Sequence, residues 1–417
     1  MTKRKLTALS AVAAALIALA VTAAAQSRPS AGTIDIGWVG DKSGPVVSSV
    51  QPQREGLEAY IRMVNSSGGV DGHQINLIEK DDQYNPTTEL SVVKSLISDN
   101  HVPMIMGLST SSGWGSVIPL FNQTKTVAYA ISANVKQMTY PFQPWVFEGN
   151  CNLSDQGDVA VAYELAHLKK KNLNGQTVGV AAIQVASGQE WTDVLDSRLQ
   201  KLGATVVNET LPASLLSADV QVGDLLAKHV SVLFFHHSLS GAISFLNSVA
   251  KLGLQVPIIS SYGPLQDSVY TTAPYDATKY YLGVNCLTPT YLATTAVGKA
   301  AATYGKKYGI ADSEIRQFFY AGGWVSGQVL VQALKNAHGD YSSNGIKRGL
   351  EAIKNLQTGL SGAISFGPKC HIGLAQVRPY TYSWKNHALS PVGSYAQWAK
   401  YITHGYAAPG TCGVPRG

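Results

Sequence analysis

Five consecutive small residues, Ser109-Thr110-Ser111-Ser112-Gly113, form the stretch of the sequence best suited to hold a small molecule. They follow an apolar run at 102–107 that is typical of a strand, and a helical pattern begins just after them. Small side chains let backbone N–H groups approach a ligand, and hydroxyls can donate hydrogen bonds to a carboxylate. The structural alternative is that these residues only cap the following helix. A second small loop, Ser132-Ala133-Asn134, comes after the next predicted strand at 126–131.

Motifs of catalysis and of cofactor binding are missing from the sequence. It contains no G-x-S-x-G, H-E-x-x-H, G-x-x-x-x-G-K-[ST] or strand-linked G-x-G-x-x-G. The pair His236-His237 could suggest a metal site, but neighbouring residues of a strand point to opposite faces and do not easily chelate together. We therefore predict that the protein is not an enzyme, needs no cofactor and binds no metal.

Predicted strands and helices alternate along most of the chain. This alternation favours βα units and a mostly parallel sheet. A chain of 417 residues is too long for one ordinary core, so two lobes of roughly 150–200 residues are expected. Gly322-Gly323 and Gly327 lie inside a helical pattern at 319–337, where they indicate close helix packing. Further helices are expected at 87–99, 158–168, 190–202, 220–228, 242–252, 294–308 and 343–355.

The stretch from Asn65 to Pro86, NSSGGVDGHQINLIEKDDQYNP, carries a recognisable order of motifs. Gly68-Gly69 ends a helix, Gly72 makes a second turn, the strand 74–78 follows, and a polar loop leads into the next helix. Together with the earlier Ser43-Gly44-Pro45 loop, this order resembles the type I periplasmic binding proteins, which are the solute receptors of ABC transporters. The resemblance continues over nearly the whole mature chain.

The resemblance implies an α/β fold of two Rossmann-like lobes with parallel sheets, joined by three hinge crossovers. The first two crossovers correspond to 145–151 and 280–287, the third to 362–368, and a strand pair at 371–384 would close the chain. The expected boundaries are 33–150 plus 287–364 for the first lobe, and 151–286 plus 365–417 for the second.

In the resembled family, the hydroxyl loop and the loop next to it hold the carboxylate of the ligand. This implies Ser109, Thr110, Ser111, Ser132, Ala133 and Asn134 as ligand-binding residues of the first lobe. The second lobe would close the pocket through three loops, which here offer Ser187, His237 and Tyr262.

The second-lobe loops depart from the pattern of branched-chain amino-acid receptors. Those receptors place tyrosines in the first two loops and a glutamate for the ligand's ammonium in the third, and no glutamate aligns here. A buried ammonium without a carboxylate partner is costly. Asp267 lies close by in sequence but is expected to face solvent. A carboxylate ligand without an ammonium group, aromatic or aliphatic, fits His237, Tyr262 and the nearby Trp114 and Trp191 better, although core packing is the alternative for each aromatic residue.

Residues 1–25 have the pattern of a secretory signal peptide. Lys3-Arg4-Lys5 is a basic start, an apolar segment follows, and Ala23-Ala24-Ala25 offers a cleavage site. Without this segment the net charge falls from +6 to +3, which indicates no nucleic-acid partner. No cysteine lies near the cleavage site, so a lipoprotein anchor is not expected. We therefore expect a periplasmic protein.

The four cysteines are even in number, and disulfides are expected in an exported protein. Four cysteines allow three pairings, among which the sequence alone does not choose. The resemblance favours Cys151–Cys286, because two crossover strands are neighbours in the family's fold, and leaves Cys370–Cys412 to tie down the tail.

Together these features predict a monomeric receptor that captures a small organic acid between its lobes and delivers it to the permease of an ABC importer. The alternatives are a receptor for branched-chain or other amino acids, a ligand sensor for a signalling partner, and an enzyme on the same fold.

Overall fold

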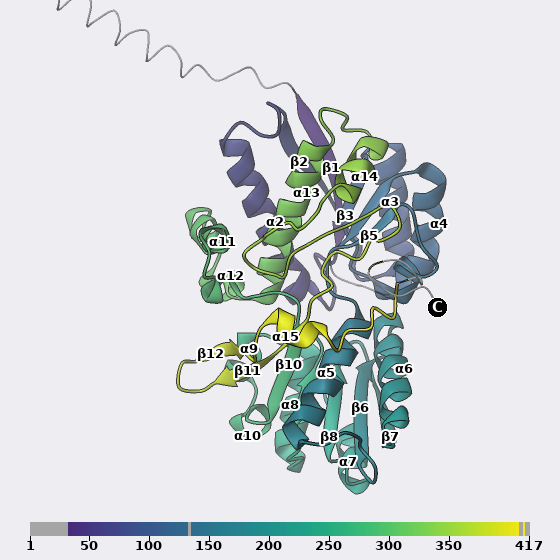
Figure 1. Cartoon of the computed structure of the whole chain (residues 1–417), viewed down its shortest axis with the longest axis vertical. Helices are drawn as coiled ribbons and strands as arrows, with labels where there is room; N and C mark the ends of the chain where they lie inside the picture. The colour runs from purple at the N-terminus through teal and green to yellow at the C-terminus, as the bar shows by residue number, and fades with distance from the viewer. Residues whose placement is uncertain (1–31, 132–134, 408–411, 413–417) are drawn as a thin grey trace, which may run out of the picture.

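Two sheets with their associated helices organise the chain, as the computed structural model shows (Figure 1). The structure describes residues 32–131, 135–407 and 412. The predicted signal peptide and the loop residues Ser132, Ala133 and Asn134 therefore lie outside the described residues. Within the described part of the chain, no helix has the length and apolar character needed to cross a membrane.

The first sheet is entirely parallel and has the strand order β2-β1-β3-β4-β5. Its strands are β1 (Thr33–Gly40), β2 (Gln74–Asp81), β3 (Met104–Gly107), β4 (Val127–Ala130) and β5 (Val146–Glu148). Strands β3, β4 and β5 are buried throughout, as expected for a parallel sheet covered on both faces.

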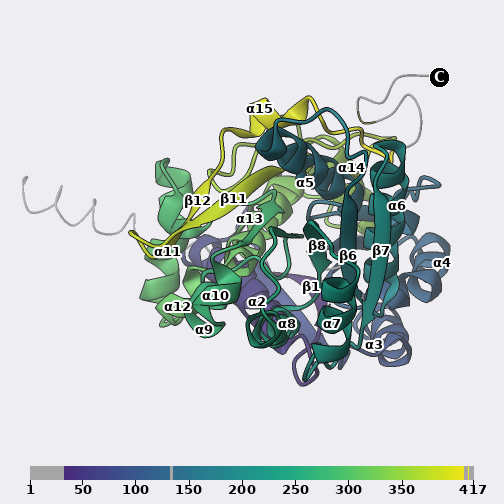
Figure 2. The same cartoon turned by 90° about the horizontal axis from the view of Figure 1, so that it is seen from below.

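The second sheet has the order β12-β11-β10-β9-β8-β6-β7 and is mixed. Its parallel strands are β6 (Thr177–Ile183), β7 (Thr205–Leu211), β8 (Val232–His236), β9 (Ile258–Ser260) and β10 (Tyr281–Asn285). Strands β11 (Arg378–Ser383) and β12 (Ala388–Pro391) add an antiparallel hairpin at one edge, where β11 pairs with β10. The hairpin is drawn in yellow in Figure 2. The predicted strand pair at 371–384 is therefore placed too early. Residue His371 accepts a hydrogen bond from the Glu148 N–H at the end of β5, so the chain reaches the hairpin only afterwards.

Helices connect the strands, as the sequence pattern predicts. The earlier ones are α2 (Val47–Ser66), α3 (Pro86–Ser98), α4 (Trp114–Thr124), α5 (Leu153–Leu168), α6 (Ala186–Lys201), α7 (Asp219–Ala227) and α8 (Leu239–Leu252). The later ones are α9 (Asp267–Thr272), α10 (Tyr275–Thr278), α11 (Ala296–Lys307), α12 (Asp312–Ile315), α13 (Phe318–Asn336), α14 (Ser343–Glu351) and α15 (Tyr395–Ala399). Short 3₁₀ turns are η2 (Ser111–Gly113), η3 (Lys136–Met138) and η4 (Thr290–Leu292).

Helix α5 begins five residues earlier than the sequence predicts. The Asn152 side chain accepts a hydrogen bond from the Asp155 N–H and caps the helix there. Leu153, in this extra turn, lines the cavity between the lobes.

Helices α2 and α13 approach each other closely in the first lobe. A Cβ atom on Gly56 would meet the backbone of Tyr320, and one on Gly323 would meet the backbone of Gln53. The prediction that Gly322-Gly323 and Gly327 allow close helix packing is confirmed, because Gly327 likewise lies against the Tyr60 side chain. This packing fixes Phe319 and Val50, which both face the space between the lobes.

Two disulfides join residues that are far apart in sequence. The structure confirms the pairs Cys151–Cys286 and Cys370–Cys412, with Cα–Cα distances of 5.8 and 5.1 Å. The first lies in the core between the segments that follow β5 and β10. The second joins Cys412, close to the end of the sequence, to Cys370.

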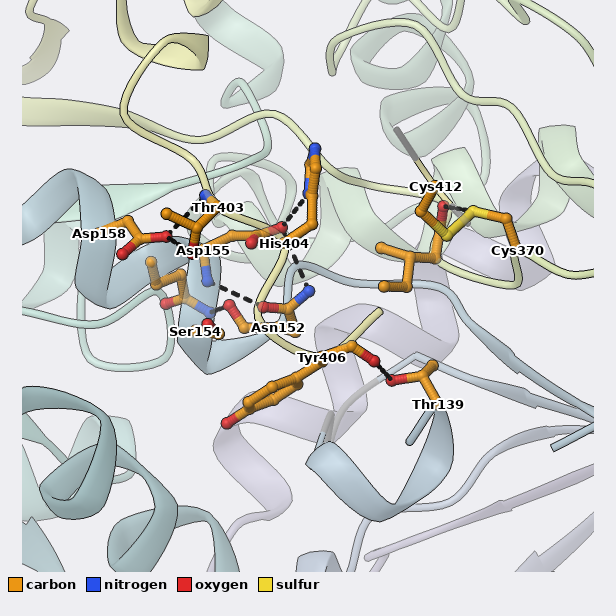
Figure 3. A network of polar contacts seen from close by, with 12 residues as sticks. Thr139, Asn152, Ser154, Asp155, Asp158, Cys370, Thr403, His404, Tyr406 and Cys412 are labelled. Atoms are coloured by element: carbon orange, nitrogen blue, oxygen red, sulfur yellow. Dashed lines mark hydrogen bonds and ion pairs between the residues drawn. A yellow bond between two sulfur atoms is a disulfide. The ribbon is translucent and has the colours of Figure 1, made fainter. Parts of the chain in front are cut away.

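The C-terminal segment contacts both lobes (Figure 3). Thr403 donates to Asp158, and His404 hydrogen-bonds Asp155, both on α5. The Tyr406 carbonyl accepts from Thr139 of the first lobe, while its hydroxyl donates to Glu190 on α6. Residues 403–406 therefore form a strap across the junction of the lobes. Further along the chain, the disulfide between Cys412 and Cys370 is its anchor.

Replacing Cys370 and Cys412 together by serine is expected to lower the free energy of unfolding by about 2–4 kcal/mol, because the disulfide closes a long loop of the unfolded chain. Denaturant titration of the double variant and the parent measures this difference. Mass spectrometry under non-reducing conditions should find Cys151–Cys286 intact in both. Equal unfolding free energies would contradict a stabilising role of the strap's anchor.

Candidate ligand-binding cleft

A cavity of about 90 Å³ lies between the two lobes, at the carboxyl ends of the parallel strands. Ligands of open α/β sheets bind at this edge, because the connecting loops diverge there. The first lobe contributes Val46, Ser49, Val50, Tyr84, Ser109, Ser111 and Phe319. The second contributes Leu153, Ile183, Ser187, His236, His237, Ser238, Tyr262 and Gly263.

Two buried carboxyl groups support the hydroxyl loop from below. The Ser109 hydroxyl donates to Asp82 at 2.7 Å, and the Thr110 hydroxyl donates to Glu89 at 2.8 Å. The N–H groups of both residues donate to the same carboxyl groups. The polar loop that the sequence motif marks, together with the start of α3, thus fixes the shape of the hydroxyl loop. Ser111 is the residue of this loop that both lines the cavity and contacts the opposite lobe through its hydroxyl.

The two supporting carboxyl groups are pushed toward their neutral forms. Burial raises the pKa of Asp82. Burial, and after it the charge of Asp82, raises the pKa of Glu89 to about 8. Two carboxylates at one buried site resist ionising together, so one proton held at Glu89 stabilises the arrangement at neutral pH.

Replacing Glu89 by glutamine should flatten the pH dependence of stability. In the folded protein the pKa of Glu89 is raised from 4.5 to about 8, so the folded state holds a proton that the unfolded chain has lost across this window. Glu89 therefore stabilises the folded state at low pH, and this contribution to the free energy of unfolding is lost as the pH rises toward 8. Denaturant titrations at several pH values give the free energy of unfolding of the parent and of E89Q. The difference between the two proteins should change with pH by up to about 1.4 kcal/mol per pH unit. Parallel curves would contradict the raised pKa.

The N-terminus of α6 meets the hydroxyl loop across the cleft. The Ser187 N–H donates to the Ser111 hydroxyl at 3.2 Å, and the Ala186 N–H donates to the Ser112 hydroxyl at 3.3 Å. The residue that precedes the helix, Val185, provides no side-chain cap. The alternative considered for the hydroxyl loop was that it caps the following helix, and α4 has no side-chain cap bond at its N-cap Gly113. The Ser111 and Ser112 hydroxyls instead accept from the start of α6.

Two buried histidines form the second-lobe wall, and burial keeps both neutral. It lowers the pKa of His236 to about 3 and that of His237 to about 4. The His237 ring lies 3.0 Å from the Pro212 carbonyl through Nε2 and accepts from the Ser238 N–H through Nδ1. Its polar atoms are therefore occupied. The His236 ring contacts Ser261 and Ser187 through its two nitrogens.

The structure brings together several of the residues that the sequence pointed to. Ser109, Ser111, Ser187, His237 and Tyr262 all line the cavity. Thr110 does not, because its hydroxyl is directed to Glu89. Whether the lining residues contact a ligand remains a prediction.

Other expectations about the site differ from the structure. Trp114 and Trp191 are fully buried core residues and do not line the cavity. The expectation that Asp267 faces solvent is wrong, because its carboxylate pairs with Arg316 at 2.7 Å and accepts from the Tyr291 hydroxyl.

Sequence reasoning missed His236, Tyr84 and Phe319 as lining residues. It assigned the two histidines to opposite faces of a strand, but β8 ends at His236, so the alternation stops there. Tyr84 lies two residues after Asp82 in the polar loop, and this position was the available signal.

Among the described residues around the cavity, none carries a charged side chain. Three carboxylates, Asp41, Asp81 and Asp82, gather beside it within the spacing that a metal ion could use. Their oxygens accept hydrogen bonds from N–H and hydroxyl groups of the chain, including those of Val46, Ser43 and Ser109. The carboxylates thereby shape the loop before α2.

The comparisons with known proteins place the chain in a family. The model of the family described as periplasmic binding protein matches residues 33–388. The chain belongs to this family. Its members are substrate-binding receptors, a class that is not enzymatic.

Individual relatives are distant. A protein from Pseudomonas aeruginosa named amino acid binding protein is 24% identical over 261 residues, which cover 62% of this chain and 68% of the relative. Several other curated relatives align with this chain over only about half of their length. The activity and partners of the whole protein therefore stay proposals.

Solved structures share the fold. A branched-chain amino-acid ABC transporter protein from Thermus thermophilus with bound valine has a TM-score of 0.78 at 17% identity, covering 87% of this chain and 96% of that one. A solute-binding protein from Rhodopseudomonas palustris in complex with 3,4-dihydroxybenzoic acid has a TM-score of 0.74 at 18% identity, covering 86% and 96%.

Proposed function

We propose that the protein is a periplasmic receptor that binds a small organic acid lacking an ammonium group between its lobes and delivers it to an ABC importer. It acts as a monomer, it is not an enzyme, and its partners are the ligand and a membrane permease. Binding of the ligand stabilises the closed arrangement of the lobes, which the permease recognises.

The uncharged lining of the cavity is the observation that carries the proposal. A carboxylate is satisfied by hydroxyls such as that of Ser111 and by the N–H groups at the start of α6, where the helix dipole favours negative charge. An ammonium group would find no carboxylate among the described lining residues, and burying it unpaired is costly. Acids without an amine therefore fit the uncharged lining of the cavity better than amino acids do.

An amino-acid ligand is the second candidate. It is favoured by the Thermus protein with bound valine and by the relatives named for amino acids, such as the one from Pseudomonas aeruginosa. The Rhodopseudomonas protein, which holds an aromatic acid, is about equally similar in structure. The uncharged lining of the cavity favours the acid.

The contact between Ser187 and His236 has the composition of a hydrolytic pair, but its environment argues against catalysis. A general base works best with a pKa near the operating pH, whereas burial lowers the pKa of His236 to about 3. Such an imidazole does not readily take the serine proton.

Mature protein mixed with p-nitrophenyl acetate should release p-nitrophenol no faster than the Ser187→Ala variant does.

A thermal-shift screen of the mature protein tests the proposed ligand class. Benzoate, pentanoate and 4-methylpentanoate represent acids, leucine and valine represent amino acids, and benzamide is a neutral control. A ligand at a hundredfold excess over its Kd adds about 2.7 kcal/mol to stability, which raises the melting temperature. Stabilisation by acids but not by leucine or valine is expected. Stabilisation by the amino acids alone would overturn the proposal in favour of the second candidate.

Replacing Ser111 by alanine should weaken binding of the stabilising acid about tenfold, since one hydrogen bond to a charged group is lost. Ser112→Ala is the matched control, because it removes the neighbouring contact between the lobes at a residue that does not line the cavity. Titration calorimetry measures both. Equal affinities of the two variants would remove Ser111 from the site.

A further inference from the structure

A chain of three polar side chains runs from the core of the second lobe to the cavity. Ser261 Oγ lies 2.7 Å from His236 Nδ1, and His236 Nε2 lies 3.1 Å from Ser187 Oγ. Ser261 is fully buried, whereas Ser187 is half-buried at the cavity wall. His236 is therefore the link between a hydroxyl that no ligand reaches and one that a ligand can touch.

Ser261 sets the direction of the hydrogen bonds in this chain. In the described part of the molecule, His236 Nδ1 is the one partner found for the Ser261 hydroxyl. If Nδ1 carried the proton, the Ser261 hydrogen would be left without an acceptor in the core, which is costly. Ser261 therefore donates to Nδ1, and the proton of the neutral ring resides on Nε2.

It follows that Nε2–H donates to the Ser187 hydroxyl oxygen. The Ser187 hydroxyl is then left with its own hydrogen to donate, and Ser187 lines the cavity. The N-terminus of α6, where Ser187 is located, adds the positive end of a helix dipole at the same place. Both effects favour an acceptor atom with partial negative charge, and both disfavour an ammonium group, which has no lone pair.

Resting on the proposed function, we propose that His236 is a positioning residue that makes Ser187 a hydrogen-bond donor, and that the ligand is an acid with a second acceptor oxygen. The carboxylate contacts the first-lobe side, where Ser111 lies, and the second oxygen, such as that of an oxo group, accepts from Ser187. The ligand class is thereby narrowed from small organic acids to those that carry a second acceptor oxygen besides the carboxylate.

Matched pairs of acids test the inference. The first pair is 4-oxopentanoate and 4-methylpentanoate, and the second is 4-acetylbenzoate and 4-isopropylbenzoate. In each pair the first acid has a carbonyl oxygen where the second has a methyl group of similar size. Titration calorimetry gives the Kd of each acid, and the readout is the ratio of the two Kd values within a pair. For the parent protein we expect the oxo acid of at least one pair to bind tenfold or more tightly.

Variants then assign this preference to the three side chains. Ser187→Ala and His236→Phe should reduce the ratio to about one, since the first lacks the donor and the second cannot orient it. Phenylalanine keeps a ring against Trp191, whose centroid lies 5.9 Å from that of His236. His236→Gln should restore most of the preference, because its amide offers an acceptor and a donor close together. A merely structural role of His236 would not predict this rescue.

Each outcome decides one claim. A parent ratio near one in both pairs overturns the inference while leaving the receptor for acids in place. A ratio that persists in Ser187→Ala or in correctly folded His236→Phe, checked by circular dichroism, also overturns it. Binding of none of the four acids overturns the proposed function and the inference together.

Discussion

The N-terminus of α6, which has no side-chain cap of its own, is the constraint around which the cleft is built. The Val185 side chain does not cap its first N–H groups. The hydroxyls of Ser111 and Ser112, from the other lobe, accept hydrogen bonds from these groups. Unpaired N–H groups at a helix start favour negatively charged or acceptor groups. The same donors can therefore serve either closure of the lobes or recognition of an acid, and this links ligand chemistry to lobe movement.

The hydroxyl loop keeps its shape because two carboxyl groups are buried beneath it. Asp82 and Glu89 use the hydroxyls of Ser109 and Thr110 and leave Ser111 to face the cleft. Holding one proton between these carboxyl groups costs less than burying two charges. The loop is therefore already ordered at the proposed ligand site, and less conformational entropy would be lost on binding there.

The fold and part of the site follow from the sequence. Alternating strands and helices predicted mostly parallel sheets, and the small residues after a strand pointed to Ser111, because parallel strands end at one edge. Ser187 followed only from the resemblance to the family. The direction of the Thr110 hydroxyl could not be predicted, since it depends on Glu89, whose side chain meets the loop only in the folded lobe. The role of Asp267 depends in the same way on Arg316, far along the chain. His236 was missed because a rule for strands was applied at the residue where the strand ends.

A crystal structure of the protein with its most stabilising acid tests the central claim most directly. The account predicts electron density for the acid between Ser111 and Ser187, with its carboxylate on the first-lobe side and the direct contact between these two residues replaced by contacts to the ligand. Density for the acid elsewhere, with the bond between the Ser187 N–H and the Ser111 hydroxyl unchanged, would contradict it.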